Sequence, residues 1–273
     1  MTTPQVQGRN VMGVTVASSP LEHVATEIYN SYGDEVVIKR KSLHKFGANQ
    51  SVGTTVEDIN WDGIEPLHSA TNSITVASSS NAGDTTQTVR VEGMYLDGND
   101  DFIFSAQNVA LNGQNQVTLS QPLCRVTRIA NVASTTETAG DVYVYETGTA
   151  TGGVPDDLDT VGNIMPFEHQ STMFAGTSIS STNYFILTSM QAGGALSGTK
   201  DTYVDILLEV RDKDSVYRTV NIFTINTSQG ASQINFDTPI IIPPNSDVDM
   251  TAVSLAAGAS ITAGFNGYFA DIV

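Results

Sequence analysis

Residues 36–53, VVIKRKSLHKFGANQSVG, separate two parts of the chain that differ in their pattern of apolar side chains. The part before this stretch has apolar residues at helical spacing, whereas the part after it alternates apolar and polar residues as β-strands do. Four of the chain's twelve Lys and Arg residues fall within positions 39–45. The formal charge of the whole chain is −17. Positive charge is therefore concentrated in this stretch, and the residues after it should form a β protein.

Two explanations of the basic cluster remain open. A charged strand can simply be solvated, with its lysines paired to the acidic surface of the same protein. The isolation of the cluster in an acidic chain instead favours a surface that binds a partner. In an extended segment Lys39, Lys41 and Lys45 should point to one side and Arg40 to the other. The candidate partner interface consists of Lys39, Arg40, Lys41, His44, Lys45 and Phe46.

Length and composition predict a folded, acidic protein of one large β domain or two domains. The chain has 273 residues, of which 40% are hydrophobic and 15% are charged. A sequence pI near 4.3 argues against nucleic-acid binding, which needs a basic surface to neutralise phosphates. With one cysteine, Cys124, the chain forms no internal disulfide and no cysteine-based zinc site, and its strand-like context predicts a buried thiol.

The first residues, MTTPQVQGRN, lack the basic start and apolar core of a signal peptide. The apolar runs are shorter than the ~20 residues that span a bilayer. We therefore expect synthesis in a cytoplasm and no membrane partner.

The order of patterns along the chain predicts an extended arm, one short helix and two β-sandwich, jelly-roll-like domains. Residues 1–19 are polar; Ser19-Pro20 then gives an N-cap and a first-turn proline, and apolar residues recur at helical spacing to residue 31. Period-two segments come next, separated by Gly, Asn and Asp turns, as in antiparallel sandwiches. The predicted units are an arm with a helix at 1–45, a first antiparallel sandwich at 46–165 and a second at 166–273. Strands are expected at 74–77, 88–94, 101–106, 116–120, 125–132 and 141–146, and at 183–190, 202–210, 216–225, 233–236, 240–242, 248–255 and 261–273.

Three local features refine this prediction. Residues 47–53 are expected to form a loop, and residues 147–163, rich in Gly, Thr and Asp, a surface loop or linker. Pro243-Pro244 should end a strand, because neither residue has an amide hydrogen to donate. In residues 202–210, Ile206 and Leu208 should face the core and Leu207 the opposite side.

No sequence motif indicates catalysis. His23, His44, His68 and His169 lack metal-ligand spacing, and neither a nucleophile elbow nor a phosphate-binding loop is present. The acidic loops at 97–101 and 156–159 leave calcium binding open, although a hairpin turn needs only the Asp-Gly of the first. We expect no enzymatic activity and no cofactor.

Several segments resemble those of one family in the same order. Residues 43–55, LHKFGANQSVGTT, resemble the HKFG-N-x-x-VGT signature near the N-terminus of a family of virion structural proteins of tailed, often marine, bacteriophages. The resemblance covers most of the chain after residue 40 and leaves the helix at 20–31 unmatched. The further similar segments are residues 76–94, 123–146, 203–223, 239–253 and 263–273.

This resemblance implies a virion protein without enzymatic activity, made in the host bacterial cytoplasm. The expected role is capsid decoration: a cement protein that binds the outer surface of the major capsid protein lattice and stabilises the shell. Its partners would be the major capsid protein and copies of itself, with a homotrimer expected from lattice symmetry. The alternative is a tail or neck component, such as an adaptor, a knob or a receptor-binding fibre domain that contacts a host surface glycan. A tail-borne glycan hydrolase is the third possibility, for which Trp61 with Asp62 and Glu65 is the sparse evidence.

Overall fold

The computed structural model describes residues 39–133, 135–195, 202–213, 215–228 and 230–271. These residues form eighteen β-strands and two 3₁₀ helices, Trp61–Gly63 and Leu158–Thr160. The predicted all-β class with antiparallel sandwiches is confirmed. The predicted arm and the helix at 20–31 lie outside the described residues. No helix that the described residues form is long and apolar enough to cross a membrane.

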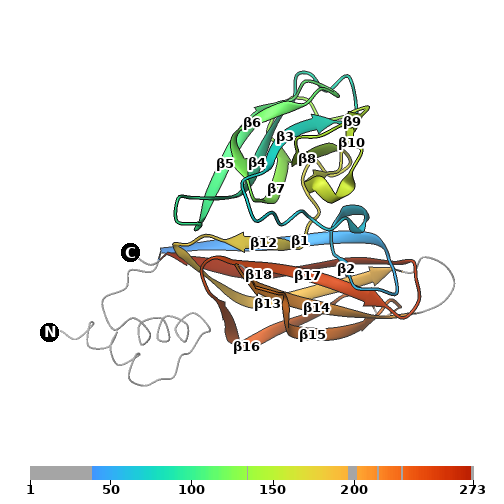
Figure 1. The fold of residues 1–273 in the computed structure, drawn as a ribbon. Coiled ribbons are helices and arrows are strands. Elements are labelled where there is room, and N and C mark those ends of the chain that lie inside the picture. The colour runs from blue at the N-terminus through green and yellow to red at the C-terminus, as the bar shows by residue number, and fades with distance from the viewer. Residues whose placement is uncertain (1–38, 134, 196–201, 214, 229, 272–273) are drawn as a thin grey trace.

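Two antiparallel sheets form the lower body in Figure 1, which we call the basal sandwich. One sheet has the strand order β1 (Lys39–Val52), β18 (Ala259–Asp271), β13 (Asn183–Ala195) and β16 (Ser232–Ile242). The other has the order β12 (Gly176–Ile179), β17 (Ser246–Ser254), β14 (Tyr203–Asp212) and β15 (Arg218–Asn226), and β2 (Glu57–Asp58) pairs with β17. Their facing apolar side chains form the largest core of the molecule.

The upper body in Figure 1, which we call the inserted sandwich, consists of two smaller sheets. One has the order β11 (Val161–Met165), β8 (Val142–Glu146), β3 (Ile74–Ser79) and β6 (Val117–Leu123). The other has the order β5 (Phe102–Ala110), β4 (Thr88–Leu96) and β7 (Arg125–Asn131). A short ribbon of β9 (Ala150–Thr151) and β10 (Val154–Pro155) lies within residues 147–163, together with the second 3₁₀ helix and the start of β11. That segment is therefore part of the inserted sandwich and not a linker.

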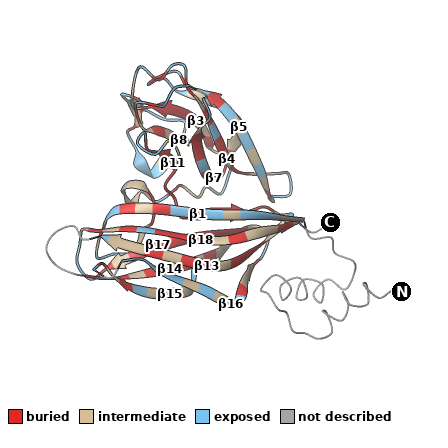
Figure 2. Ribbon diagram, turned by 180° about the vertical axis from the view of Figure 1, so that it is seen from behind, coloured by how far each residue is buried: buried red, intermediate tan, exposed pale blue. Residues whose placement is uncertain are grey.

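The alternation of apolar and polar residues along a strand determines which of its side chains face the core. In β14 the side chains of Val204, Ile206, Leu208 and Val210 are all buried, whereas Leu207 between them is half-buried on the opposite face. The predicted facing of this strand is confirmed, because successive side chains of a strand point to opposite sides. Figure 2 shows the resulting alternation of buried and less buried positions along the basal strands.

The two bodies do not follow one another along the chain. β1 pairs antiparallel with the last strand, β18, from Lys39 opposite Asp271 to Val52 opposite Ala259. Val52 and Ile59 belong to the basal core, and so do residues from Ala175 onward. The predicted boundary after residue 45 thus lies within β1, and residues 46–60 belong to the basal sandwich, not to the first one along the chain. The inserted sandwich interrupts the basal one because the strands that close the basal sheet lie at opposite ends of the sequence.

The loop predicted at residues 47–53 is a strand instead. β1 continues through Gly47 to Val52, and Ala48 N–H donates to the Met173 carbonyl oxygen at 3.0 Å. A Cβ on Gly47 would overlap the backbone of Ile59 and of Ala175. The glycine marks a place where three backbone segments cross closely, and not a turn.

Other predicted strands differ in extent. The segments predicted at 233–236 and 240–242 are one strand, β16, which ends at Ile242 before the two prolines as expected. β12 was not predicted. All four of its residues are buried, so it shows no alternation of apolar and polar side chains.

Candidate functional site

The predicted interface residues all lie on β1, the edge strand of the basal sandwich that faces the inserted sandwich (Figure 1). Lys39 and Arg40 are placed through their backbone, opposite Asp271 and Ala270 of β18. The side chains of the other residues of the cluster separate into two groups, one on each face of the strand.

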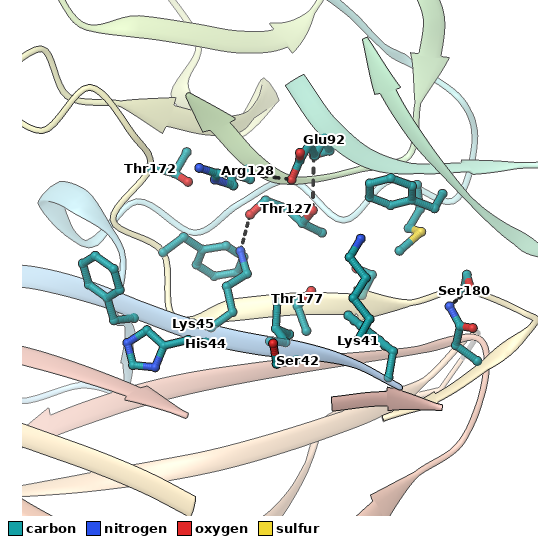
Figure 3. Close-up of a pocket in the computed structure, with 18 of the residues that line it drawn as sticks. Lys41, Ser42, His44, Lys45, Glu92, Thr127, Arg128, Thr172, Thr177 and Ser180 are labelled. Carbon is teal, nitrogen blue, oxygen red and sulfur yellow. Dashed lines mark hydrogen bonds and ion pairs between the residues drawn. The ribbon is translucent and has the colours of Figure 1, made fainter. Parts of the chain in front are cut away.

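A cleft of about 690 Å³ lies between the two sandwiches (Figure 3). Its floor is formed by β1 and β12, and its roof by β4, β5 and β7 of the inserted sandwich. Three cationic side chains, Lys41, Lys45 and Arg128, line it together with one carboxylate, Glu92. Many of the remaining lining side chains carry hydroxyl groups: Ser42, Thr127, Ser171, Thr172, Thr177, Ser178 and Ser180.

Lys45 points from β1 into this cleft and is 9% exposed. Its Nζ donates a hydrogen bond to the backbone carbonyl of Thr127 on β7, and it lies 5.8 Å from the ring centroid of Phe174. Burial, with the nearby Arg128 charge, lowers the pKa of Lys45 to about 8. Glu92 opposes this change. The side chain therefore connects the two sandwiches instead of lying free on the surface.

Lys41 lies on the same face of β1 but is exposed. Its Nζ is 5.7 Å from the ring centroid of Phe104, a cation–π distance at the opening of the cleft. On the roof, Glu92 accepts from Arg90 at 2.7 Å and lies 3.7 Å from Arg128. Exposed pairs of this kind contribute about 0–1 kcal/mol each.

His44 and Phe46 occupy the alternate positions of β1 and are exposed. The His44 ring shares a hydrogen bond with the Asn266 side chain of β18, and its centroid lies 5.9 Å from that of Phe46. The predicted cluster thus lies on two faces of β1, with Lys41 and Lys45 on one and His44 and Phe46 on the other, although all four residues border the cleft. Lys41 and Lys45 share one side as predicted, but Lys45 is already engaged within its own chain.

A buried ionic cluster that was not predicted from the sequence joins the sandwiches. Nε of Arg125 on β7 donates to both carboxylate oxygens of Asp247 on β17, at 3.1 Å from each. Asp247 also accepts from Arg211 of β14 at 2.6 Å and from the Ser178 hydroxyl of β12 at 2.6 Å. Burial alone would raise the pKa of Asp247, but the guanidinium groups of Arg125 and Arg211 hold it at about 2. The sequence carries only a weak signal for this cluster: Arg125 lies between the apolar Cys124 and Val126, and Asp247 lies in a segment that also contains Ser246 and Asp249.

A second group of side chains, of which only Asp249 is fully buried, lies beside this cluster. The Tyr217 hydroxyl donates to Asp249, and it lies 2.9 Å from Nδ1 of His68. Burial raises the pKa of Tyr217 and lowers that of His68 to about 3. Both shifts favour the neutral forms. The three side chains resemble a proton-transfer triad in connectivity, yet neither the phenol nor the imidazole is activated by its surroundings.

A pocket of about 350 Å³ next to Tyr217 is acidic. Burial, together with the neighbouring Glu65 and Glu209, raises the pKa of Asp58 to about 7. Burial and the charges of Asp58 and Asp247 raise the pKa of Asp249 well above its usual range. Among the described residues, no group of three or more His, Cys, Asp or Glu side chains is arranged to hold a metal ion.

The two acidic loops use their carboxylates to order backbone. Asp97 Oδ1 accepts from the amides of Asn99 and Asp101 in the β4–β5 hairpin, and these bonds lower the pKa of Asp97. Asp157 Oδ1 accepts from the amide of Asp159 at the start of the second 3₁₀ helix. Both are turn and cap interactions.

The outer face of the β12–β17–β14–β15 sheet exposes apolar side chains. Ile222 of β15, 54% exposed, pairs across the sheet with Leu207 of β14. Val220 and Tyr203 are also exposed, and Leu255, just after β17, is 77% exposed. On this face the apolar side chains lie among the polar pairs Thr224–Asp205 and Thr219–Glu209. Apolar side chains that gather on the surface of a folded protein mark interaction sites.

No protein-family model matches the sequence. No curated protein matches it either. Among solved structures, the chain is similar to the N-terminal CBM22-1–CBM22-2 tandem domain of Xyn10C from Paenibacillus barcinonensis, at 12% identity and a TM-score of 0.22, over 86% of this chain and 93% of that one. It is also similar to VP2 of the infectious bursal disease virus subviral particle, at 10% identity and a TM-score of 0.21, over 99% of this chain and 78% of that one. At these values neither similarity assigns a function to this chain.

Proposed function

We propose that the protein is a non-enzymatic structural protein of a bacteriophage virion, a capsid decoration protein that binds the outer surface of the major capsid protein lattice. The ordered resemblance of its segments to a family of phage virion proteins supports this proposal. So does the all-β architecture, in which two sandwiches are joined by buried charges. The joint matters because a cement subunit must transmit load between the capsomers that it bridges.

The main structural observation behind this proposal is the set of exposed apolar side chains on the outer face of β14 and β15. Leu207 and Ile222 pair across β14 and β15, the exposed Val220 lies beside them at a β-bulge, and such exposed apolar side chains on a sheet suit a protein partner better than a small ligand. The formal charge of −17 disfavours unspecific self-association of this face. A multivalent assembly, such as a trimer that contacts several capsomers, multiplies the modest affinity of each contact. The shell is then held by the summed binding energy.

Virion occupancy tests the proposal. The double variant Val220→Asp/Ile222→Asp places two charges on the exposed apolar face and should reduce decoration of particles at least tenfold. The matched control Ala106→Asp/Asn108→Asp places the same charges on exposed positions of the edge strand β5 and should leave decoration unchanged. Densitometry of purified particles measures both.

The number of copies of the protein per virion distinguishes a capsid decoration role from a tail or neck role. A decoration protein should be present in hundreds of copies per virion, and a tail or neck component in about a dozen or fewer. A dozen copies would replace the capsid role by the tail role, and absence from the particle would overturn the proposal. Full decoration by the Val220→Asp/Ile222→Asp variant would exclude this sheet face as the binding surface.

A further inference from the structure

The cleft between the two sandwiches runs along the free edge of β1. Every residue from Lys41 to Phe46 lines it. Successive side chains of a strand point to opposite faces, so a cleft on one face of β1 would be lined by alternate residues only. A cleft that is lined by six consecutive residues lies along the edge of the strand, where side chains from both faces border it.

β12, on the other side of the cleft floor, is also an edge strand. Among the described residues β1 pairs only with β18, and β12 pairs only with β17. The segment that leads into β12 meets β1 at one end of the cleft, where Ala48 N–H donates to the Met173 carbonyl oxygen at 3.0 Å. In the described part of the chain no further backbone hydrogen bond joins β1 to residues 173–179. Beyond this one bond the cleft separates the two edges.

This bond identifies the backbone groups of β1 that face the cleft. The register of β1 with β18 is uninterrupted up to Asn49, and the backbone groups of successive residues in a strand point to alternate edges. The amide of Ala48 points away from β18, so the backbone groups of Ser42, His44 and Phe46 do as well. No backbone group of the described residues pairs with these three. They form a row of donors and acceptors to which a further strand can be added.

The side chains around this edge favour an acidic strand. Lys41, Lys45 and Arg128 line the cleft, and Glu92 is the one carboxylate among the described residues that line it. Lys45 already donates to the Thr127 carbonyl, whereas Lys41 and Arg128 are exposed. Figure 3 shows Lys41 directed from β1 toward the strands of the roof. The volume of about 690 Å³ is in the range of ligand-binding sites.

We propose that the cleft binds an extended peptide segment of a partner protein, with carboxylates at alternate positions, which adds as a strand to the free edge of β1. Its backbone bonds to the amides and carbonyls of Ser42, His44 and Phe46, and its carboxylates approach Lys41 and Arg128. This site goes beyond the proposed capsid role, because the β14–β15 face lies at the other end of its sheet from β12.

Binding of a fluorescein-labelled peptide in which glutamate alternates with valine tests the proposal. Anisotropy is measured with the full-length protein in about 0.15 M salt, which screens long-range repulsion by the acidic chain. Lys41→Glu and Arg128→Glu should each weaken binding at least about fivefold, because each reverses a charge at the cleft. Arg218→Glu makes the same change at an exposed position of β15, outside the cleft, and should have less than about a twofold effect.

Two results would overturn the proposal at this stage. One is the absence of binding to the wild type, which would mean that the lysines only guard the edge against pairing. The other is an equal loss of affinity in all three variants.

Strand addition also predicts that the peptide backbone contributes to binding. The same peptide with N-methylated amides keeps its carboxylates but loses its donors, and it should bind at least about tenfold more weakly. In the complex with the unmethylated peptide, hydrogen exchange of the Ser42, His44 and Phe46 amides should slow at least about tenfold. The amides of Leu43 and Lys45 face β18 and should change less. Equal affinity of the two peptides, or unchanged exchange at the three amides, would overturn strand addition.

Two further probes define the chemical class of the ligand. The peptide with glutamine in place of glutamate should bind at least about fivefold more weakly, since it lacks the charge. An oligogalacturonate offers carboxylates without a peptide backbone, and tighter binding of this saccharide than of the peptide would overturn the peptide partner. The variant Val220→Asp/Ile222→Asp should bind the peptide as the wild type does, so a failure of the proposed capsid role is distinguishable from a failure of this site.

Discussion

Lys45 illustrates how burial changes the structural role of a charged residue. In the sequence it is one of four basic residues within seven positions, and it looks like part of an exposed surface. In the structure its ammonium group lies between two β bodies, hydrogen-bonded to the Thr127 carbonyl. Lys41, four positions earlier on the same face, remains exposed. The difference arises because the roof of the cleft lies close over Lys45 and opens at Lys41.

The lowered pKa of Lys45 predicts a specific pH dependence of stability. Its pKa is about 8 in the folded protein and about 10.5 in the unfolded chain, so the unfolded chain holds the proton more tightly between these values. Relative to Lys45→Met, the wild type should therefore gain stability as pH rises from about 8 to 10.5, by roughly 1–3 kcal/mol. Urea unfolding of both proteins across this range measures the effect.

Lys41→Met is the control for this prediction, because it removes an exposed lysine from the same face of β1. A difference that stays constant with pH for Lys45→Met, or one that is equally pH-dependent for Lys41→Met, would contradict the assigned environment of Lys45.

At the scale of elements, the orientation of β14 can be predicted from its sequence pattern, whereas that of β1 cannot. β14 sits in the middle of its sheet with β17 on one side and β15 on the other, and its alternation matches its burial residue by residue. β1 is an edge strand, and residues from both of its faces border the cleft. A strand with one well-defined core face can be placed from its pattern, whereas such an edge strand cannot.

The β14 register predicts a pair of substitutions with contrasting effects. Ile206→Ala removes a fully buried side chain from the basal core and should lower the free energy of unfolding by roughly 2–5 kcal/mol. Leu207→Ala, one position along on the half-buried outer face, should cost about 1 kcal/mol or less. Chemical denaturation of the two variants compares them directly, and equal losses would show that the facing of β14 is reversed or undefined.

At the scale of the whole molecule, buried charges join the two sandwiches. Asp247 sits in the basal sandwich and is bound by Arg211 from the same sandwich and by Arg125 from the inserted one. Arg125 also donates to the Ser69 and Cys124 carbonyls and lies 5.0 Å from the Phe102 ring centroid. Such a group is costly to break, because removing one partner leaves the others desolvated. The two bodies should therefore unfold together.

Arg125→Met tests this coupling. It leaves Asp247 paired with Arg211 but removes the ion pair between the sandwiches, so we expect a loss of roughly 3–5 kcal/mol and a calorimetric transition that divides in two. Arg128→Met removes an exposed arginine from the same strand and should cost about 0–1 kcal/mol while preserving a single transition. A single unchanged transition in Arg125→Met would mean that the apolar and backbone contacts of the junction suffice without this ion pair.

The sequence alone determined the fold class, most strand positions, the end of β16 at its prolines and the facing of β14. These depend on local patterns: alternation over a few residues, turn residues and the missing amide hydrogen of proline. It also placed Cys124 correctly as a buried thiol, whose pKa burial raises to about 11.

Only the tertiary structure decided how the bodies are connected and which charges are buried. β1 pairs with β18 across more than two hundred residues, and no local pattern encodes the partner of a strand. Gly47 looked like a turn residue because a close crossing of three backbones and a turn both favour glycine. Arg125 and Asp247 became a buried pair because two strands from different bodies meet there. Burial is a property of what surrounds a residue, and in this protein those surroundings are assembled from distant parts of the chain.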